Sequence, residues 1–355
     1  MTHKRPLALL LLTLGATALA TLAAPAATSA PSASGRSGWQ PVPIQSEQNF
    51  RGLAAVSRKK AWVAGSGGEI WRTANGGKTW LNVSPPGAEA LEFRDIEVHG
   101  RHRVSALAIG EGEQNQIFRS TDNGATWTRT FISDEPTSFY DCMAFFPGGR
   151  VGLAVSDPVE GQMRMIRTTD AGRTWQQVPP EGFPAPVDGE FYFAASGTCL
   201  VTVGGHTAYL GSGGGAARIF ASRDRGRTWT VAESTLPASD AGGVFSLAFR
   251  APRKGIAVGG DFLNETVGVD FSASTRDGRE WRNAGDLGGY RSGVAWLGHG
   301  RWFVAVGPTG TDITRNDGRS WRTIDTVRYD AVDCTARGAC WASGPAGAAA
   351  RARLR

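Results

Sequence analysis

The stretch that decides the fold is Ser120-Thr121-Asp122-Asn123-Gly124-Ala125-Thr126-Trp127, because this pattern of Ser/Thr, Asp, Gly and Trp recurs along the chain. Its chemistry is that of a turn. The Asp carboxylate accepts hydrogen bonds from backbone amides of its own loop, the Gly adopts a positive φ, and the Trp packs between neighbouring sheets. We assign a structural role of this kind to Asp122, Gly124, Trp127, Asp170, Gly172, Trp175, Asp224, Gly226 and Trp229.

Three looser copies of the pattern complete a set of six. They begin at Thr73, Ser274 and Thr314, and they carry Asn75, Arg276 and Asn316 where the Asp stands in the clean copies. The tryptophans of the six copies recur at roughly 40 to 50 residues, which is the length of one four-stranded propeller blade. The repeat therefore predicts an all-β fold of successive blades with Asp-box turns.

Apolar segments between the boxes predict the second strands of the blades, as in residues 61–65, 151–155, 255–259, 302–307 and 340–344. The last of these copies has no box after it, whereas Trp39-Gln40-Pro41-Val42 at the other end resembles the strand that follows a box. We expect this N-terminal strand to complete the last blade, because closing the ring removes two open sheet edges. The prediction is a single seven-bladed β-propeller over residues 38–355.

The composition agrees with many short strands. The chain has 355 residues, 41% of them hydrophobic and 20% charged, with 48 Gly and 12 Trp but 4 Met. This composition excludes a disordered chain and disfavours a helical bundle. The formal charge of +6 comes mainly from scattered arginines, with no run of Lys and Arg that would suggest a nucleic-acid-binding arm.

The N-terminus predicts export. Residues 1–26 combine a basic start, an apolar stretch and small residues up to Ala26, which is typical of a cleaved signal peptide, and residues 27–37 indicate a linker. A retained membrane anchor is the alternative, and no later segment is apolar enough to span a bilayer. We expect a secreted or periplasmic protein in which Cys334 and Cys340, either side of a short turn, form a disulfide rather than remain buried thiols. Pairing of Cys142 with Cys199 stays open.

These features resemble one known family. The Asp boxes, the segment Trp62-Val63-Ala64-Gly65 and the segment Asn49-Phe50-Arg51-Gly52-Leu53 are similar to the photosystem II stability/assembly factors and their relatives in non-photosynthetic bacteria. The resemblance covers about residues 39–355. It implies an exported propeller that acts as an assembly chaperone and binds its client through an arginine-rich surface. It implies that the partner is a protein, but it does not identify that protein.

Each blade is predicted to begin with an aromatic residue and one further residue at the mouth of the central channel. Aligning the blades in this way gives the candidate binding residues Arg51, Arg94, Asp141, Tyr192, Ser246, Arg291 and Asp330. Arginines that converge on a concave mouth can bind carboxylates bidentately, so an acidic segment of a protein is the predicted ligand. The alternative is that the Arg and Asp side chains pair with one another. Longer loops at 156–162, 179–190, 204–218 and 259–270 are expected on the same face.

The rival interpretation is a glycoside hydrolase or a carbohydrate-binding propeller, since Asp boxes also occur in sialidases. A sialidase needs a Tyr nucleophile with acidic partners, for which Tyr192 or Tyr290, Glu190 and Asp141 are candidates. The sialidase motif Arg-Ile-Pro is absent, however, because Arg51 is followed by Gly52-Leu53. His99 and His102 lack a third ligand, so we expect no metal, no other cofactor and no catalytic residue, in a monomeric binding module.

Overall fold

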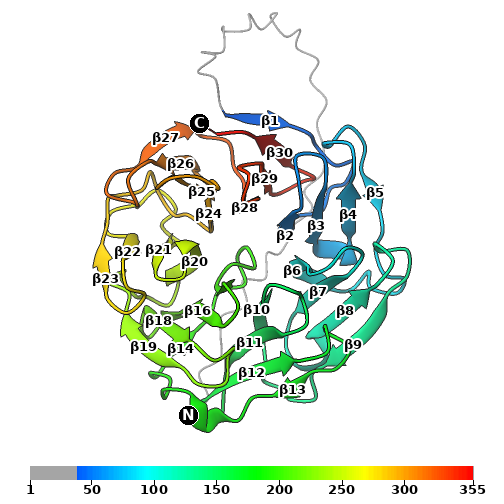
Figure 1. Cartoon of the computed structure of the whole chain (residues 1–355), viewed down its shortest axis with the longest axis horizontal. Coiled ribbons are helices and arrows are strands. Elements are labelled where there is room, and N and C mark those ends of the chain that lie inside the picture. Colours follow the sequence, from blue (N-terminus) through cyan, green and yellow to red (C-terminus); the bar gives the residue numbers. More distant parts are fainter. Residues whose placement is uncertain (1–37, 355) are drawn as a thin grey trace, which may run out of the picture. The chain divides into compact units, whose positions relative to one another are not determined.

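Seven antiparallel sheets surround a central axis in the computed structural model, which describes residues 38–354 (Figure 1). The predicted signal peptide and linker lie outside the described residues. Each sheet is one blade, and its strands follow one another outward from the axis. The prediction of a seven-bladed all-β propeller is therefore confirmed. No helix within residues 38–354 has the length and apolar character needed to cross a membrane.

The first three blades are regular meanders. Blade 1 contains β2 (Phe50–Ala55), β3 (Ala61–Gly65), β4 (Ile70–Thr73) and β5 (Leu81–Asn82). Blade 2 contains β6 (Glu92–Val98), β7 (Val104–Ile109), β8 (Gln116–Ser120) and β9 (Thr128–Ile132). Blade 3 contains β10 (Tyr140–Phe145), β11 (Gly152–Val159), β12 (Gln162–Thr168) and β13 (Gln176–Gln177). Short 3-10 turns cover Ser66–Gly68, Gly112–Gln114 and Pro180–Gly182.

The next two blades carry an insertion. Blade 4 contains β15 (Leu200–Val203), β16 (Thr207–Gly211), β18 (Arg218–Ser222) and β19 (Thr230–Glu233). Blade 5 contains β20 (Gly242–Ala251), β21 (Lys254–Asp261), β22 (Ser272–Thr275) and β23 (Trp281–Asn283). Two short strands, β14 (Glu190–Phe191) and β17 (Gly213–Gly214), extend the sheet of blade 5 at β20.

The two ends of the described range, residues 38–354, meet in the last blade. Blade 6 contains β24 (Gly293–Trp296), β25 (Phe303–Gly307), β26 (Gly310–Thr314) and β27 (Arg322–Asp325). Blade 7 contains β28 (Ala331–Cys334), β29 (Cys340–Ser343), β30 (Ala349–Ala352) and β1 (Trp39–Pro41). β1 pairs antiparallel with β30, with Trp39 opposite Ala352.

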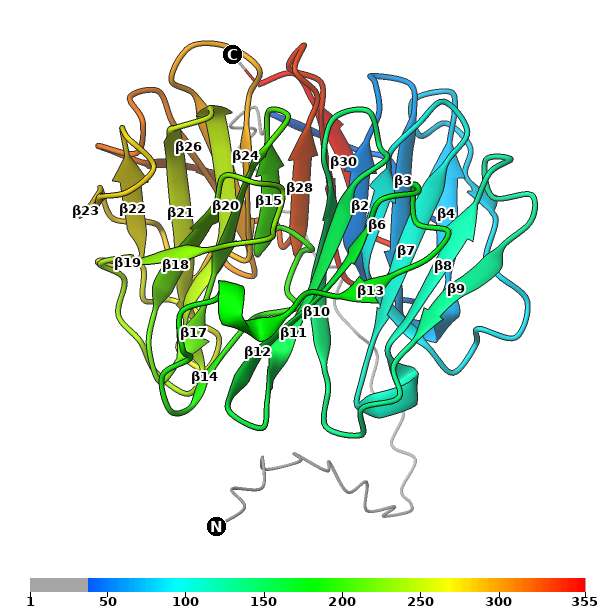
Figure 2. The same ribbon diagram turned by 60° about the horizontal axis from the view of Figure 1, so that its bottom comes forward.

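In every blade the turns alternate between two ends. The connection from first to second strand lies at one end, because successive strands are antiparallel. The connection from third to fourth strand, which contains the Asp box, lies at the same end in blades 1 to 6, whereas blade 7 lacks it because its fourth strand is β1. We call this end the box face. The other connections lie at the opposite end, which we call the channel-end face. In Figure 2 the end of β30 marks the box face at the top, and β14 and β17 lie toward the channel-end face.

The Asp-box turns form as predicted from their residue types. Asp122 accepts hydrogen bonds from the Thr126 amide at 2.9 Å and from the Ser120 hydroxyl at 2.8 Å, while the Gly124 amide donates to Ser120 Oγ. Gly124 has a φ of 82°. Trp127 donates its indole N–H to the Val83 carbonyl of the preceding blade at 2.6 Å. This box thus closes its own turn and joins two blades, and Trp80 and Trp321 likewise donate to the preceding blade.

The fifth box differs from its prediction. Asp277, and not Arg276, accepts the backbone amides of Arg279 and Glu280, and Thr275 supplies the hydroxyl that bonds Asp277 and Gly278. The turn is one residue shorter than in the clean copies. A carboxylate is therefore retained, and the box is not distorted by an arginine.

One histidine is buried between blades 2 and 3. His99 stacks on Phe145 with ring centroids 3.8 Å apart, and its two nitrogens contact Ser105 Oγ at 2.9 Å and the Gly149 carbonyl at 3.2 Å. Burial, more than any nearby charge, lowers the pKa of His99 from 6.5 to about 4. The neutral form is therefore the one that the folded state accommodates.

We expect His99 to destabilise the fold in acid. Because its pKa is lower in the folded state, its contribution is complete above about pH 6.5 and is lost as the pH falls toward 4, by roughly 3 kcal/mol. Chemical denaturation of the wild type and of His99→Gln between these pH values measures the difference. A parallel pH dependence in the two proteins would contradict the assignment.

Candidate functional site

The channel-end face holds three of the predicted binding residues at equivalent positions. Arg51, Arg94 and Asp141 each follow the aromatic residue of the inner strand and fall at a register shift, where the strand carries one residue more than its partner. Such bulges turn a side chain away from the ladder. Asp330 occupies the corresponding place in blade 7, where its amide donates to the Ser343 carbonyl.

The alignment by aromatic residues does not hold in blade 4. Tyr192 does not begin the inner strand, which is β15, and its side chain lies in the hydrophobic core, where its hydroxyl donates to Met163 Sδ at 2.9 Å. Burial raises the pKa of Tyr192. Residues 191–192 belong to the insertion that contains β14, and their aromatic pair imitated the start of a blade.

Ser246 and Arg291 are also buried. Ser246 bonds Thr198 Oγ1 at 2.6 Å and accepts the Val294 amide, and the register shift in β20 falls at Phe245. Arg291 has no exposed side-chain surface, and its Nε donates to Asp312 Oδ2 at 2.8 Å. Neither side chain reaches the mouth.

The arginines at the channel-end face are ion-paired. The connections and strand ends of this face carry six of them within residues 38–354, and every one makes an ion pair: Arg51 and Arg328 with Asp330, Arg94 with Glu92, Arg164 with Glu135, Arg218 with Glu190, and Arg291 with Asp312. This is the alternative that the sequence left open.

Arg51, Arg94, Asp330 and Tyr290 do come together. Arg51 Nε lies 3.6 Å from Asp330 Oδ2. Burial lowers the pKa of Arg94, and the nearby positive charge of Arg51 lowers it further. Burial raises the pKa of Tyr290, which also lies close enough to Arg51, Arg94 and Asp330 to be influenced by their charges. Arg51 and Arg94 keep 28% and 19% of their side-chain surface exposed, so they are the arginines of the predicted set that a partner could reach.

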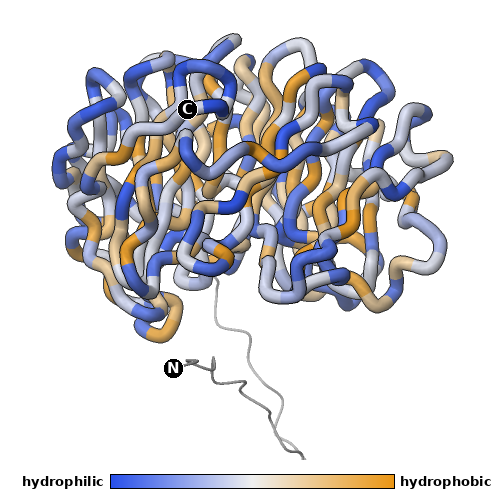
Figure 3. Tube along the Cα trace, turned by 90° about the horizontal axis from the view of Figure 1, so that it is seen from below, coloured by the Kyte–Doolittle hydropathy of each residue, from blue (hydrophilic) through white to orange (hydrophobic). Residues whose placement is uncertain are grey.

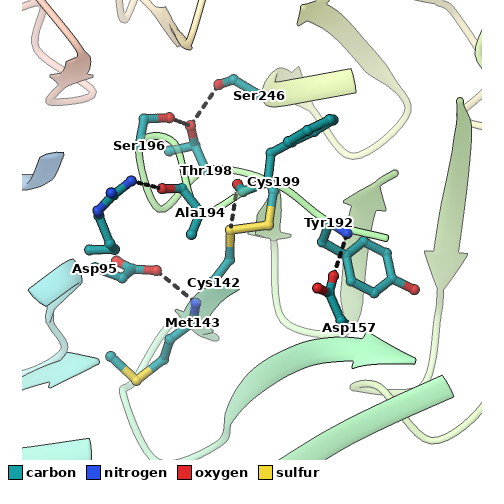
Figure 4. The surroundings of a disulfide bond; sticks show 12 residues. Asp95, Cys142, Met143, Asp157, Tyr192, Ala194, Ser196, Thr198, Cys199 and Ser246 are labelled. Atoms are coloured by element: carbon teal, nitrogen blue, oxygen red, sulfur yellow. Dashed lines mark hydrogen bonds between the residues drawn. A yellow bond between two sulfur atoms is a disulfide. The ribbon is translucent and has the colours of Figure 1, made fainter. Parts of the chain in front are cut away.

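Residues 192–199, the channel segment, cross the inside of the ring (Figures 1 and 4). The Ala194 carbonyl accepts from Arg94 at 2.6 Å, Ser196 donates to the Ser292 carbonyl at 2.7 Å, and Thr198 bonds Ser246. A disulfide joins Cys199 to Cys142 of β10. The segment therefore contacts blades 2, 3, 5 and 6, and the protein's own backbone occupies the mouth.

Both cysteine pairs are bridged in the structure. The predicted disulfide between Cys334 and Cys340 is present across the hairpin of β28 and β29. The pairing of Cys142 with Cys199, which the sequence left open, is also present.

Exposed apolar side chains gather beside the channel segment. Phe262, with 43% of its surface exposed, packs edge-on against Phe193 and Phe245, and Leu263 is 76% exposed. Val267 and Val269 of the same loop are exposed as well. Several large apolar side chains exposed on one loop favour an interaction site. The sequence indicated a long loop here but did not single out these apolar side chains.

Two of the other predicted loops are shorter than expected. Residues 204–218 contain β16 and β17, and residues 156–162 form a hairpin between β11 and β12. The candidate sialidase residues Tyr192, Glu190 and Asp141 lie within electrostatic range of one another, but all three are buried. Glu190 is held by Arg218, Tyr192 is in the core, and Asp141 is buried on β10. Within residues 38–354, no group of three or more His, Cys, Asp or Glu side chains is arranged to hold a metal ion.

Comparison with known proteins agrees with the fold. No known family profile matches the chain. The photosystem II assembly lipoprotein Ycf48 of Synechococcus sp. (strain CC9902) is 23% identical over 171 residues, which span 48% of this chain and 46% of that protein. The alignment thus covers about half of this curated relative.

Solved structures with the same fold cover nearly the whole chain. Ycf48 bound to a D1 peptide has a TM-score of 0.60 at 12% identity, covering 90% of this chain and 96% of its own. Ycf48 from Cyanidioschyzon merolae has a TM-score of 0.60 at 14% identity, with 89% and 98% covered. A GH74 xyloglucanase from Xanthomonas campestris has a TM-score of 0.59 at 16% identity, with 89% and 54% covered. The chain is thus a seven-bladed β-propeller that resembles the photosystem II assembly factors.

Proposed function

We propose that this protein is an exported binding module that acts as an assembly factor or scaffold and holds a segment of a protein partner on its channel-end face. The observation that carries the proposal is the exposed apolar loop at residues 262–269, which adjoins the aromatic cluster of Phe193, Phe245 and Tyr290. The similarity to Ycf48, one structure of which contains a D1 peptide, supports a peptide or protein ligand.

Arg51 and Arg94 complete the proposed surface. Both are partly exposed, and the ion pair of Arg51 with Asp330 is long at 3.6 Å. A carboxylate of the partner could replace Asp330 or the Ala194 carbonyl as acceptor, with bidentate geometry. The rest of the face gives specificity through apolar contacts. Arg291, included with these two in the sequence prediction, stays a structural residue.

Partner capture tests the proposal. The tagged protein, from Ala27 onward, is used for affinity purification from the envelope fraction of its host, and bound proteins are identified by mass spectrometry. We expect Phe262→Ser/Leu263→Ser to reduce the recovered partner at least about tenfold, as for an interface hot spot. Arg51→Gln/Arg94→Gln should reduce it as well.

The matched control changes exposed apolar residues elsewhere. Val56→Ser/Leu81→Ser removes side chains that are 41% and 54% exposed away from the loop, and we expect wild-type recovery. Equal recovery by the wild type and Phe262→Ser/Leu263→Ser would refute the docking surface. Turnover of a fluorogenic sialoside by the purified protein would refute the non-enzymatic function.

A further inference from the structure

The charges of the propeller are divided between its two ends. On the box face of five blades, the Asp-box turn is hydrogen bonded to the hairpin between the first and second strands of the same blade. For example, the Gly76 amide donates to the Lys59 carbonyl, and the Asp317 amide donates to the Arg301 carbonyl. Hairpins and boxes therefore present their side chains together. Loops at the end of the molecule near the C-terminus are largely hydrophilic in Figure 3.

The hairpins supply one ring of cations. Six of the seven have at least one exposed arginine: Arg58, Arg101, Arg150, Arg253, Arg301 and Arg337. The fourth blade has His206 at this place. Since the blades are arranged around the axis, these guanidinium groups are spread around the whole face rather than gathered at one point.

The boxes supply a second ring. The residue that follows the box glycine is an exposed cation in five of the six boxes: Lys78, Arg173, Arg227, Arg279 and Arg319. The Asp-box fold does not require a charge here, because the second box has Ala125 at the same position.

Almost none of these eleven cations forms an ion pair with an acidic side chain. Among residues 38–354, a single ion pair involves one of them, between Arg301 and Asp317 at 3.5 Å. The carboxylates of the clean boxes point into their own turns, and hydrogen bonds from those turns lower the pKa of Asp122 to about 2. The box acids thus stabilise the turns while the cations face outward.

The channel-end face has the opposite character. All of its arginines are ion-paired, as described above, whereas exposed carboxylates on its connections have no ion-pair partner within residues 38–354: Glu47, Glu89, Glu111, Asp134, Glu181 and Asp240. One end of the propeller is therefore strongly positive and the other negative.

We propose that the box face docks on the surface of an anionic phospholipid bilayer. Charge complementarity is the argument, and the shape of the cationic surface selects a bilayer rather than a strand of nucleic acid. Two concentric rings on short turns fit a planar anionic layer, whereas a linear polymer is tracked by a stripe or groove of cations. The exposed apolar residues of loop 262–269 lie at the other end, so adsorption would be electrostatic and peripheral.

Docking in this way would orient the protein. The box face would lie against the lipid headgroups, and the channel-end face would point away from the membrane toward a partner. This inference goes beyond the proposed function and does not depend on it. The two faces are separate, and the substitutions that test the two proposals lie on different faces.

Vesicle binding tests the proposal. The protein from Ala27 onward keeps every strand described above and is mixed with vesicles of phosphatidylcholine alone or with about 30% phosphatidylglycerol, at about 0.1 M salt. We expect sedimentation with the anionic vesicles only, and release at about 0.5 M salt, where screening shortens the range of the interaction.

The decisive variant is Arg173→Gln/Arg227→Gln/Arg279→Gln/Arg319→Gln. We expect its partition onto anionic vesicles to fall by about fivefold per arginine. The matched control, Gln45→Glu/Ala90→Glu/Gln114→Glu/Thr137→Glu, lowers the net charge equally at exposed positions of the channel-end face outside loop 262–269 and should bind like the wild type.

Equal loss of binding in both variants would overturn the proposal, because net charge and not the box face would then be responsible. Binding to neutral vesicles would overturn it as well. So would an absence of vesicle binding together with tight binding to duplex DNA at the same salt concentration, which would identify a polymer ligand instead.

Discussion

Replacing Cys142 and Cys199 with alanine is expected to lower the free energy of unfolding by about 4 kcal/mol. The disulfide closes a loop with a sequence separation of 57, and the cost of restoring that freedom to the unfolded chain grows with loop length. Cys334 and Cys340 are separated by 6, so the same substitutions there should cost about 2 kcal/mol. Urea denaturation without reductant measures both values.

The same variant should loosen the channel segment. With the covalent link removed, residues 192–199 are held across the ring by noncovalent contacts only, among them the hydrogen bonds of Ala194, Ser196 and Thr198. Limited proteolysis should then cleave within this range in Cys142→Ala/Cys199→Ala and spare it in Cys334→Ala/Cys340→Ala. Equal losses of stability in the two double variants, or the same cleavage pattern, would contradict this account.

Replacing Asp312 with alanine is expected to cost about 4 kcal/mol. Asp312 and Arg291 have no exposed side-chain surface, and Asp312 also accepts hydrogen bonds from the Gly288 amide and the Thr323 hydroxyl. Removing the carboxylate leaves a buried guanidinium without its counter-charge, and that desolvated cation is the source of the loss. Thermal or urea unfolding of the purified variant gives the value.

Two further variants distinguish the effect of the unpaired charge on stability from the effect of lost packing. Arg291→Met/Asp312→Leu removes both charges and should recover much of the stability, because neither charge is then left alone. Glu280→Gln breaks the exposed pair of Arg282 and Glu280 and should change stability by less than about 0.5 kcal/mol. A loss from Asp312→Ala as small as that from Glu280→Gln would show that water reaches Arg291.

The architecture could be predicted because the signal is local and repeated. An Asp box such as residues 120–127 contains its hydroxyl, its carboxylate and its glycine within one turn, so the sequence alone specifies the hydrogen bonds. Blades 1, 2 and 3 follow the aromatic alignment for the same reason, since Phe50, Phe93 and Tyr140 each stand beside a bulge.

The candidate site was harder to predict because the positions of its side chains depend on contacts with residues far away in the sequence. Arg291 follows an aromatic residue as Arg51 does, but its side chain is buried and bonded to Asp312 on β26. Phe191-Tyr192 resembles the start of a blade, yet Tyr192 packs against blade 3 and β14 pairs with β17. The cations after the box glycines were visible in the sequence, but their common face follows only from the arrangement of the turns.

The pairing of β1 with β30 has a consequence for when the protein can fold. Its two strands lie at opposite ends of the described chain, and Gln40 meets Arg351 across 311 positions. A chain emerging from the ribosome can form its middle blades early, but β1, the outer strand of the seventh blade, has no partner until β30 at the other end of the propeller has been synthesised. Until then the ring has an open seam, so a protein truncated anywhere before β30 should behave as an unfinished and aggregation-prone product rather than as a smaller propeller.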